Sequence, residues 1–437
     1  MDLIPKPDQI VSAASNVAHK MLYGGLADLR PMPRTLIDDG MLREVYHYRP
    51  VAKVKEEGDP ILLVTPLAAP SSCFDLRRGC SMVEHFVTEG RPTYLVEYGE
   101  ISFRDRNLGM EHWIDEVVPT AIRVVSEHAG GRPVHVVGWS LGGIFATLAA
   151  ADQPDLPIGS LTIVGSPFDV SKVPMIAPIR PLLNMNLPER FKPITKGYQL
   201  MGGAPKPLVR WAFQLSAFDK LVTKPLVKIQ KMDDVDFLAQ LEAVEAFTAG
   251  MIAYPGRTFG QLYHRFAKGN ELSQGRIDFG DRTIEIKNVK APTLVFGGAT
   301  DGIAPAQCVK PVVDLLTGAK EVRWEIVPGG HLGMLTGRAA RNTTWRILDE
   351  WVEQWSSDAE VKPKPRKQAA KKTAATQSRR APAVKKAASE KATSAKSTAK
   401  KTAKKSAAAK KRAPKADAIG VNPTRRYGSK GSRSLSR

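Results

Sequence analysis

The chain has 437 residues and a formal net charge of +20, but the positive charge is concentrated at one end. Residues 361–437 contain 25 lysines and arginines against two acids, so residues 1–360 carry a net charge of −3. The length suits one large domain with an insertion, and no stretch is apolar enough for a membrane span. Three scattered cysteines exclude a disulfide framework, and no nucleotide, flavin or metal motif is present, so the sequence predicts no cofactor and no metal.

The first 40 residues predict a short helix, Ile10 to Met21, followed by an irregular segment rich in proline. Beyond it, short apolar runs rich in β-branched residues alternate with stretches of helical periodicity. This alternation predicts a mostly parallel sheet flanked by helices, an α/β core over residues 41–167 and 289–357. The expected strands are 61–65, 93–98, 134–137, 161–164, 293–296 and 322–327, and the expected helices are 82–89, 113–128, 144–151, 306–316 and 342–355.

The alternation stops between residues 168 and 288, which are rich in proline, methionine and phenylalanine and contain a helical stretch at 235–249. We interpret this segment as a helical cap inserted into the core. An apolar cap with methionines is suited to line a substrate pocket, although packing on the core alone would also explain it. Residues 358–437 are rich in lysine and alanine and lack large apolar side chains, which predicts a disordered tail.

The clearest chemical motif is the sequence GWSLGG around Ser140, which follows a strand-like run and precedes a helical one. This is the G-x-S-x-G pattern of a sharp strand-to-helix turn that exposes a serine hydroxyl. The flanking glycines leave room for the turn, and the helix N-terminus favours developing negative charge. The pattern predicts that Ser140 is a nucleophile and that the amide of Leu141 is one oxyanion donor.

A serine nucleophile needs a base and an acid that orients the base, in the chain order serine, acid, histidine. Asp301 follows the predicted strand at 293–296, at the carboxyl end where ligands bind in parallel sheets. His331 follows the next predicted strand in the glycine-rich turn PGGHLGM. An aspartate before a glycine is usually only a turn residue, and Asp301 alone would not indicate catalysis. The predicted triad of Ser140, His331 and Asp301 rests on the occurrence of all three residues in the expected chain order.

A second oxyanion donor is expected in the turn after the strand at 61–65. Pro66 has no N–H group, so the predicted donor is the amide of Leu67, or that of Ala68 if the turn is shifted. Among the remaining histidines, His135 lies inside a predicted strand and is expected to be packed rather than catalytic. Two further residues are alternative acids, although neither ends a predicted core strand: Asp75 and Asp281.

With these motifs in view, most of residues 30–355 resemble the polyhydroxyalkanoate synthase-like branch of the α/β-hydrolase superfamily. The resemblance rests on the blocks ILLVTPLAAPSSCFDLRRGC, GWSLGG, TIVGSPFDV, FGGATDGIAP and PGGHLGML, which occur in the family's order. It implies an α/β-hydrolase fold, with Asp301 and His331 as acid and base. The synthases carry a cysteine at the position of Ser140, and this difference puts polymer synthesis in doubt.

The sequence therefore predicts a serine hydrolase, an esterase, lipase or thioesterase that acts on an ester or thioester of a lipid-like or hydroxyacyl substrate through an acyl-enzyme. A synthase-like acyltransferase stays open, because the choice of acceptor depends on water access to the acyl group. A non-catalytic scaffold with a functional tail is the third hypothesis, and the ordered set of catalytic residues argues against it.

The basic tail at 361–437 suggests binding to an anionic partner without sequence readout. Nucleic acid and an anionic lipid surface would both satisfy its charges, and a solvated tail that only aids solubility is the third interpretation. The N-terminal residues lack a basic cluster followed by an apolar run, so no signal peptide is expected. We therefore expect a cytoplasmic protein, associated through its tail with the nucleoid, a lipid body or a membrane surface.

Overall fold

The computed structural model describes residues 7–185, 197, 200–216, 227 and 230–357. The chain divides into two compact units, residues 1–364 and residues 365–437. The predicted disorder of residues 358–437 lies outside the described residues, and so does the predicted binding of this tail to nucleic acid or lipid. Every helix and strand with a described position belongs to the first unit.

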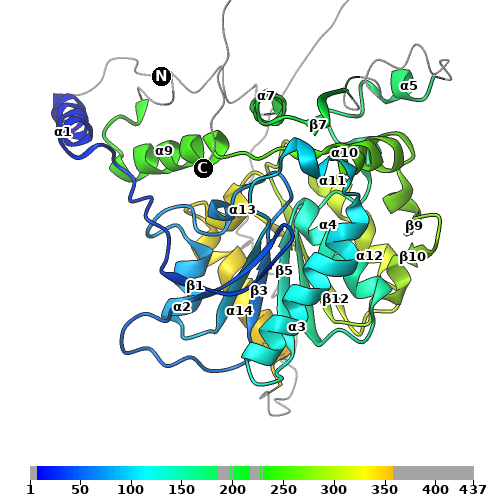
Figure 1. The fold of residues 1–437 in the computed structure, drawn as a ribbon. Helices are drawn as coiled ribbons and strands as arrows, with labels where there is room; N and C mark the ends of the chain where they lie inside the picture. Colours follow the sequence, from blue (N-terminus) through cyan, green and yellow to red (C-terminus); the bar gives the residue numbers. More distant parts are fainter. Residues whose placement is uncertain (1–6, 186–196, 198–199, 217–226, 228–229, 358–437) are drawn as a thin grey trace, which may run out of the picture. The chain divides into compact units, whose positions relative to one another are not determined.

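An eight-stranded sheet forms the centre of the first unit, in the order β1-β2-β4-β3-β5-β6-β11-β12 (Figure 1). The six strands from β4 to β12 in this order are parallel, and each coincides with a strand expected from the sequence, which confirms the α/β class. The strands are β1 (Arg34–Gly40), β2 (Arg43–Tyr48), β3 (Ile61–Val64), β4 (Thr93–Glu97), β5 (Val134–Trp139), β6 (Ile158–Val164), β11 (Thr293–Gly298) and β12 (Val322–Val327).

The structure corrects the predicted boundary at residue 40. Strands β1 and β2 form an antiparallel hairpin, and β2 pairs with β4, so residues 34–48 belong to the sheet. The sequence analysis missed this hairpin because β1 is an edge strand with polar residues and no continuous apolar run. The predicted helix at the N-terminus is confirmed as α1 (Pro7–Tyr23).

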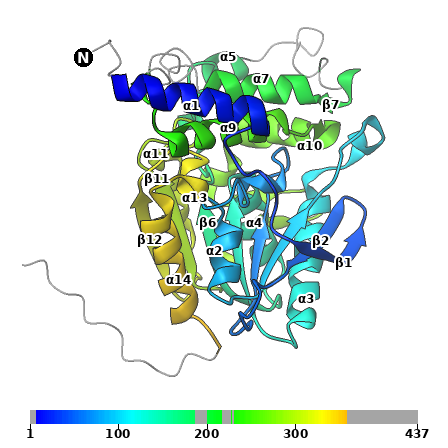
Figure 2. The ribbon, with the colours of Figure 1, turned by 90° about the vertical axis from the view of Figure 1, so that its left-hand side faces the viewer.

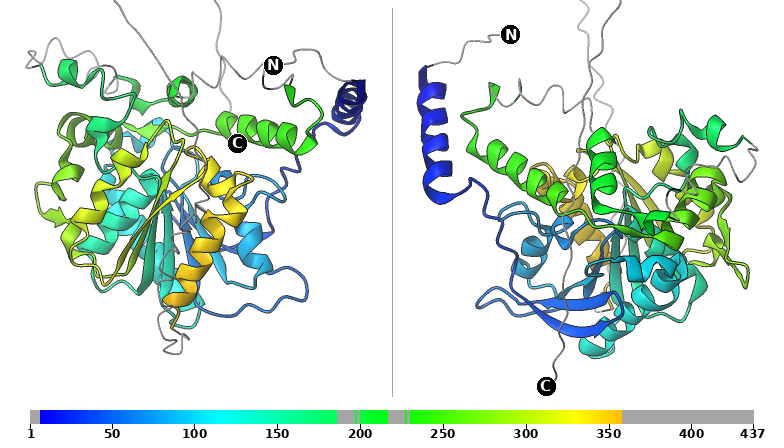
Figure 3. Two further views of the ribbon diagram at one scale, coloured as in Figure 1. Left: turned by 180° about the vertical axis from the view of Figure 1, so that it is seen from behind. Right: turned by 45° about the horizontal axis from the view of Figure 1, so that its top comes forward.

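Helices cover both faces of the sheet, as Figures 2 and 3 show. The side chains of β3 alternate between two apolar clusters, because successive strand residues point to opposite faces. Leu62 and Val64 pack with α3 (Val118–His128) and α4 (Leu141–Asp152), whereas Ile61 and Leu63 pack with α2 (Met82–Thr88) and α14 (Thr344–Gln354). Both faces of the parallel strands are therefore buried, which explains their continuous apolar sequences.

Two of the predicted helices differ from those observed. The stretch at 113–128 begins with a π-helical segment, His112–Val117, before α3. The stretch at 306–316 is divided into α11 (Ala306–Val309) and α12 (Pro311–Leu315), because Pro311 lacks the N–H group that would continue the first helix.

The insertion predicted at 168–288 lies between β6 and β11 in the chain. Its helices α7 and α9 lie above the carboxyl edge of the parallel strands (Figures 1 and 2). Its last part packs beside the core, since Arg282 between β9 and β10 binds Asp152 at the end of α4. The elements are α5 (Arg180–Leu183), β7 (Gly203–Ala204), α7 (Lys206–Ser216), α9 (Val235–Ala249), β8 (Tyr254–Pro255), α10 (Gly256–Gln261), β9 (Arg276–Asp278) and β10 (Thr283–Glu285).

Candidate active site

Ser140 occupies the single residue between β5 and α4. Its backbone has φ 53° and ψ −123°, a conformation that costs a non-glycine residue free energy and that occurs at functional turns. The amide of Ser140 donates to the carbonyl of Val164 at 2.8 Å, which fixes the turn against β6. Ser140 follows the last residue of β5 and therefore lies at the carboxyl edge of the sheet, where its side chain is only partly buried.

Glycines around Ser140 allow the backbones of the turn and of its neighbours to approach closely. A Cβ atom on Gly138 would lie 2.5 Å from the Cα atom of Gly143. A Cβ atom on Gly142 would lie 2.4 Å from the carbonyl oxygen of Val64, at the end of β3. Both contacts are with backbone, which cannot move aside as a flexible side chain can, so the predicted reason for these glycines is confirmed.

The structure brings together the three residues of the predicted triad. The Nε2 atom of His331 lies 3.0 Å from the Oγ atom of Ser140. Its Nδ1 atom lies 2.8 Å from the Oδ2 atom of Asp301. The three residues follow β5, β12 and β11, whose parallel directions put their carboxyl ends at one edge of the sheet.

Asp301 is held in its ionised form by the groups around it. The side chain is buried, and its second oxygen accepts hydrogen bonds from the amides of Ile303 at 2.8 Å and Ala304 at 2.9 Å. Burial would raise the pKa of the Asp301 carboxyl, but the charge and hydrogen bond of His331 and the two amides lower this pKa below its ordinary value. A carboxylate in this position favours the imidazole tautomer that carries its proton on Nδ1.

The surroundings of His331 include residues that the sequence analysis did not single out. The indole of Trp139 donates to the carbonyl of His331 at 3.1 Å, and the two rings lie 4.9 Å apart. A Cβ atom on Gly165, at the end of β6, would lie 2.7 Å from the side chain of Met334 and 3.4 Å from the His331 ring. Trp139 is the variable residue before the nucleophile in G-x-S-x-G, so the pattern gives no signal for its role.

The two predicted oxyanion donors lie on adjoining segments. Leu141 is the first residue of α4, and the amides of the first helical turn have no acceptor within the helix. Leu67 lies in a turn closed by a hydrogen bond from the amide of Ala69 to the carbonyl of Pro66 at 3.1 Å, and its own amide has no acceptor among the described residues. The close approach of Gly142 to the end of β3 brings the two segments together.

The alternative acids and His135 lie outside this site. Asp75 is buried and accepts hydrogen bonds from the amide of Met32 and the hydroxyl of Ser81, both at 2.6 Å. Asp281 is exposed and pairs with its neighbour in the sequence. His135 is buried within β5, where its Nδ1 atom lies 2.8 Å from the hydroxyl of Ser160, in agreement with the prediction that it is packed.

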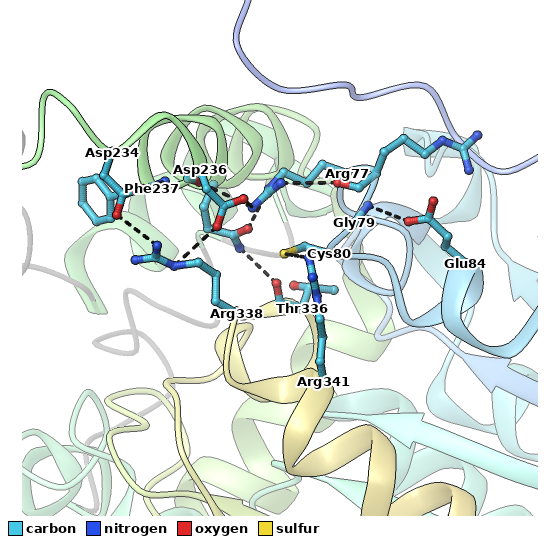
Figure 4. Close-up of polar contacts among 12 residues, drawn as sticks. Arg77, Gly79, Cys80, Glu84, Asp234, Asp236, Phe237, Thr336, Arg338 and Arg341 are labelled. Carbon is cyan, nitrogen blue, oxygen red and sulfur yellow. Dashed lines mark hydrogen bonds and ion pairs between the residues drawn. The ribbon is translucent and has the colours of Figure 1, made fainter. Parts of the chain in front are cut away.

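Polar contacts of Arg77 and Arg338 anchor helix α9 to the core (Figure 4). The buried guanidinium of Arg77 binds Asp236 at 2.7 Å and Gln240 at 2.9 Å. Arg338 binds Asp234, the N-cap of α9, at 3.0 Å. At the other end of the helix, the Phe247 ring lies 6.2 Å from that of Trp139. The helix therefore covers the residue that precedes the candidate nucleophile.

Among the described residues, no group of three histidine, cysteine or acidic side chains has the arrangement of a metal site. No helix in the described part of the chain is long and apolar enough to cross a membrane.

Comparison with curated sequences identifies relatives over most of the chain. The poly(3-hydroxyalkanoate) polymerase subunit PhaC of Thiocystis violacea is 23% identical over 313 residues, which cover 71% of this chain and 85% of the relative. The PhaC subunit of Synechocystis sp. is 24% identical and covers 72% of this chain and 81% of the relative. The PhaC subunit of Cupriavidus necator is 22% identical, and the alignment covers 72% of this chain and 54% of the relative.

Similar solved structures include the esterase RhEst1 from Rhodococcus sp. ECU1013, with a TM-score of 0.44, 15% identity and coverage of 74% of this chain and 98% of that chain. Another is the Paleococcus ferrophilus monoacylglycerol lipase, with a TM-score of 0.42, 16% identity and coverage of 71% of this chain and 99% of that chain.

Residues 61–342, more than half of the chain, match the Alpha/beta hydrolase family. The chain therefore belongs to the alpha/beta hydrolase family, in the branch that is similar to the poly(3-hydroxyalkanoate) polymerases.

Proposed function

We propose that this enzyme hydrolyses an ester or thioester of a lipid-like or hydroxyacyl substrate through an acyl-enzyme on Ser140. The observation that carries the proposal is the hydrogen-bonded chain from Ser140 Oγ to His331 Nε2, at 3.0 Å, and from His331 Nδ1 to Asp301, at 2.8 Å. The positive φ of Ser140 supports it, because strained backbone of this kind concentrates at functional turns.

In the proposed mechanism, the Nε2 atom of His331 accepts the proton of Ser140 as Oγ attacks the acyl carbonyl carbon. The amides of Leu141 and Leu67 donate hydrogen bonds to the resulting oxyanion. The intermediate then expels an alcohol or thiol, which takes its proton from His331, and leaves the acyl group as an ester on Ser140. A water molecule, deprotonated by His331, attacks this ester and releases the acid and the serine hydroxyl.

Acyl transfer to a hydroxyacyl acceptor is the second candidate function. The similarity to poly(3-hydroxyalkanoate) polymerase subunits favours it. The serine at position 140 favours hydrolysis. The polyhydroxyalkanoate synthases, which this chain resembles, use a cysteine at this position, and an oxygen ester on serine is a poorer acyl donor for repeated transfer than a thioester on cysteine. The two functions share Ser140, His331 and Asp301 and differ only in what attacks the acyl-enzyme.

The test measures product release from a panel of p-nitrophenyl esters and acyl-coenzyme A thioesters, including hydroxyacyl thioesters. We expect Ser140→Ala to lower kcat by about 10⁴-fold or more. Ser160→Ala is the matched control, because Ser160 also lies 2.8 Å from a histidine ring, that of His135, but within the sheet. We expect this control to keep activity within tenfold of the wild type, and the ratio of free acid to transferred product then separates hydrolysis from transfer.

Turnover that survives Ser140→Ala would overturn the proposal. Equal loss in both variants would also contradict it, because the effect would then come from a general weakening of the sheet. Thermal unfolding of each variant shows whether the fold is retained.

A further inference from the structure

A pocket of about 460 Å³ that is not lined by the candidate catalytic residues lies between the 3₁₀ turn Phe103–Asn107, which follows β4, and the segment from α10 to Lys268. Its walls include three arginines (Arg106, Arg257 and Arg265), a histidine, two side-chain amides and three glycines. All of these lining residues are described, and none is acidic. The volume is within the range of small-molecule sites, so charge and size together suit a small anion.

The arginines keep donors available for a ligand. Among the described residues, Arg106 has no acidic partner, and it donates one hydrogen bond to the Phe103 carbonyl at 3.2 Å while its guanidinium lies over the Phe103 ring. Arg257 binds Glu111 at 2.6 Å, and Arg265 binds Glu271 at 3.2 Å. A guanidinium has five donors in a planar fork, so one bond to a protein group leaves others to bind an anion.

The glycines make part of the wall from backbone. A Cβ atom on Gly256 would lie 2.9 Å from the Gly202 carbonyl oxygen and 3.0 Å from that of Arg106. A Cβ atom on Gly202 would lie 2.4 Å from the Phe103 ring. A larger residue at either position would displace its neighbours, so the two glycines allow the segments that line the pocket to approach closely.

The pocket lies at the same edge of the sheet as Ser140. The turn that carries Arg106 follows β4, which is parallel to β5 and two strands away from it. At the usual spacing between strands, the carboxyl ends of β4 and β5 lie about 10 Å apart. Arg106 lies nine residues beyond the end of β4, so kinetics rather than strand spacing must decide whether one substrate spans the pocket and Ser140.

We propose that this pocket binds a phosphate or pyrophosphate group, with Arg106 and Arg257 as its main ligands. The group belongs either to the acyl donor or to a separate small molecule. Planar guanidinium groups match phosphate oxygens by paired, charge-assisted hydrogen bonds. Arg257 and Arg265 are each paired with a carboxylate outside the lining, so the charge of Arg106 is the one that no ion pair among the described residues balances. Binding of the group is independent of the proposed function of Ser140.

The test is a calorimetric titration of the full chain with inorganic pyrophosphate at about 0.15 M ionic strength, where long-range attraction is screened. We expect saturable binding, with Kd raised about tenfold or more in Arg106→Gln and in Arg257→Gln. The matched control is Arg49→Gln, since Arg49 is also exposed and its side chain donates to the hydroxyl of Thr35 at 3.1 Å. The basic tail is the same in all four proteins, so the difference between variants isolates the pocket.

Kinetics distinguish the two sources of the phosphate group. If the acyl donor carries it, Arg106→Gln raises the KM for an acyl-coenzyme A thioester but not for the p-nitrophenyl ester of the same acid. If a separate molecule carries it, both KM values stay unchanged while pyrophosphate binding is weakened. Absence of saturable binding to the wild type, or equal binding to all variants, would overturn the proposal, whereas loss of turnover in Ser140→Ala tests only the proposed function.

Discussion

Replacement of Asp301 by asparagine separates the role of its charge from that of its shape. The side-chain oxygen of asparagine still accepts hydrogen bonds from the amides of Ile303 and Ala304, which lie 2.8 and 2.9 Å from the carboxylate. The amide nitrogen then faces the Nδ1 atom of His331, where the carboxylate oxygen lies at 2.8 Å in the wild type. Because this nitrogen donates, His331 must accept on Nδ1 and carry its proton on Nε2.

The altered tautomer removes the base. With a proton on Nε2, His331 no longer accepts the proton of Ser140 across the 3.0 Å contact between them. In a serine protease, the corresponding substitution lowers kcat by about 10⁴-fold. We expect a loss of this size here, which corresponds to about 5 kcal/mol of transition-state stabilisation.

The assay is hydrolysis of the best p-nitrophenyl ester at pH 7, with Asp75→Asn as the control. Asp75 is also a buried carboxylate, but it binds Met32 and Ser81 rather than His331. We expect folded Asp75→Asn to keep kcat within about fivefold of the wild type. The reasoning is refuted if folded Asp301→Asn keeps kcat within tenfold of the wild type, or if both variants lose activity equally.

Three further predictions concern stability and the cap. Gly142→Ala puts a methyl group 2.4 Å from a backbone oxygen of β3, so we expect chemical denaturation to show that the free energy of unfolding falls by about 1–3 kcal/mol. Gly333→Ala is the control, because no atom from another part of the chain lies within 4 Å of the added methyl group, and we expect it to have little effect. Burial lowers the pKa of His135 from its ordinary value of 6.5 to about 4, so in this pH window the unfolded chain binds a proton that the folded chain does not. The free energy of unfolding therefore falls by up to a few kcal/mol as the pH decreases from 6.5 to 4. We expect a smaller fall in His135→Gln, and an equal pH dependence of unfolding in both proteins would contradict the prediction. Asp236→Asn leaves the guanidinium of Arg77 without its anion, although the Arg77 side chain is only 7% exposed. We therefore expect the rate of amide hydrogen exchange in α9 to rise about fivefold to tenfold. An unchanged exchange rate would show that α9 is held in place without this ion pair.

The amino-acid sequence by itself determined the α/β class and the six parallel strands. A buried parallel strand is a continuous apolar run of β-branched residues, and this pattern is local enough to be recognised without the fold. The turn at Ser140 is also local, since the glycines that it needs lie within three residues of the serine. The motif at Ser140 and the chain order of Ser140, Asp301 and His331 predicted the three as a set, but not the distances between them.

Only the tertiary structure decided which distant residues meet. Ser140 and His331 are 191 residues apart, and their contact depends on strand order in the sheet. The hairpin of β1 and β2 has no strong local signal, because pairing with β4 rather than its own apolarity holds it in the sheet. Arg77 and Asp236, and likewise Arg106 and Arg257, are neighbours only because the insertion folds over the carboxyl edge. Local propensity carries no information on such contacts, since packing and loop closure between separate segments determine them.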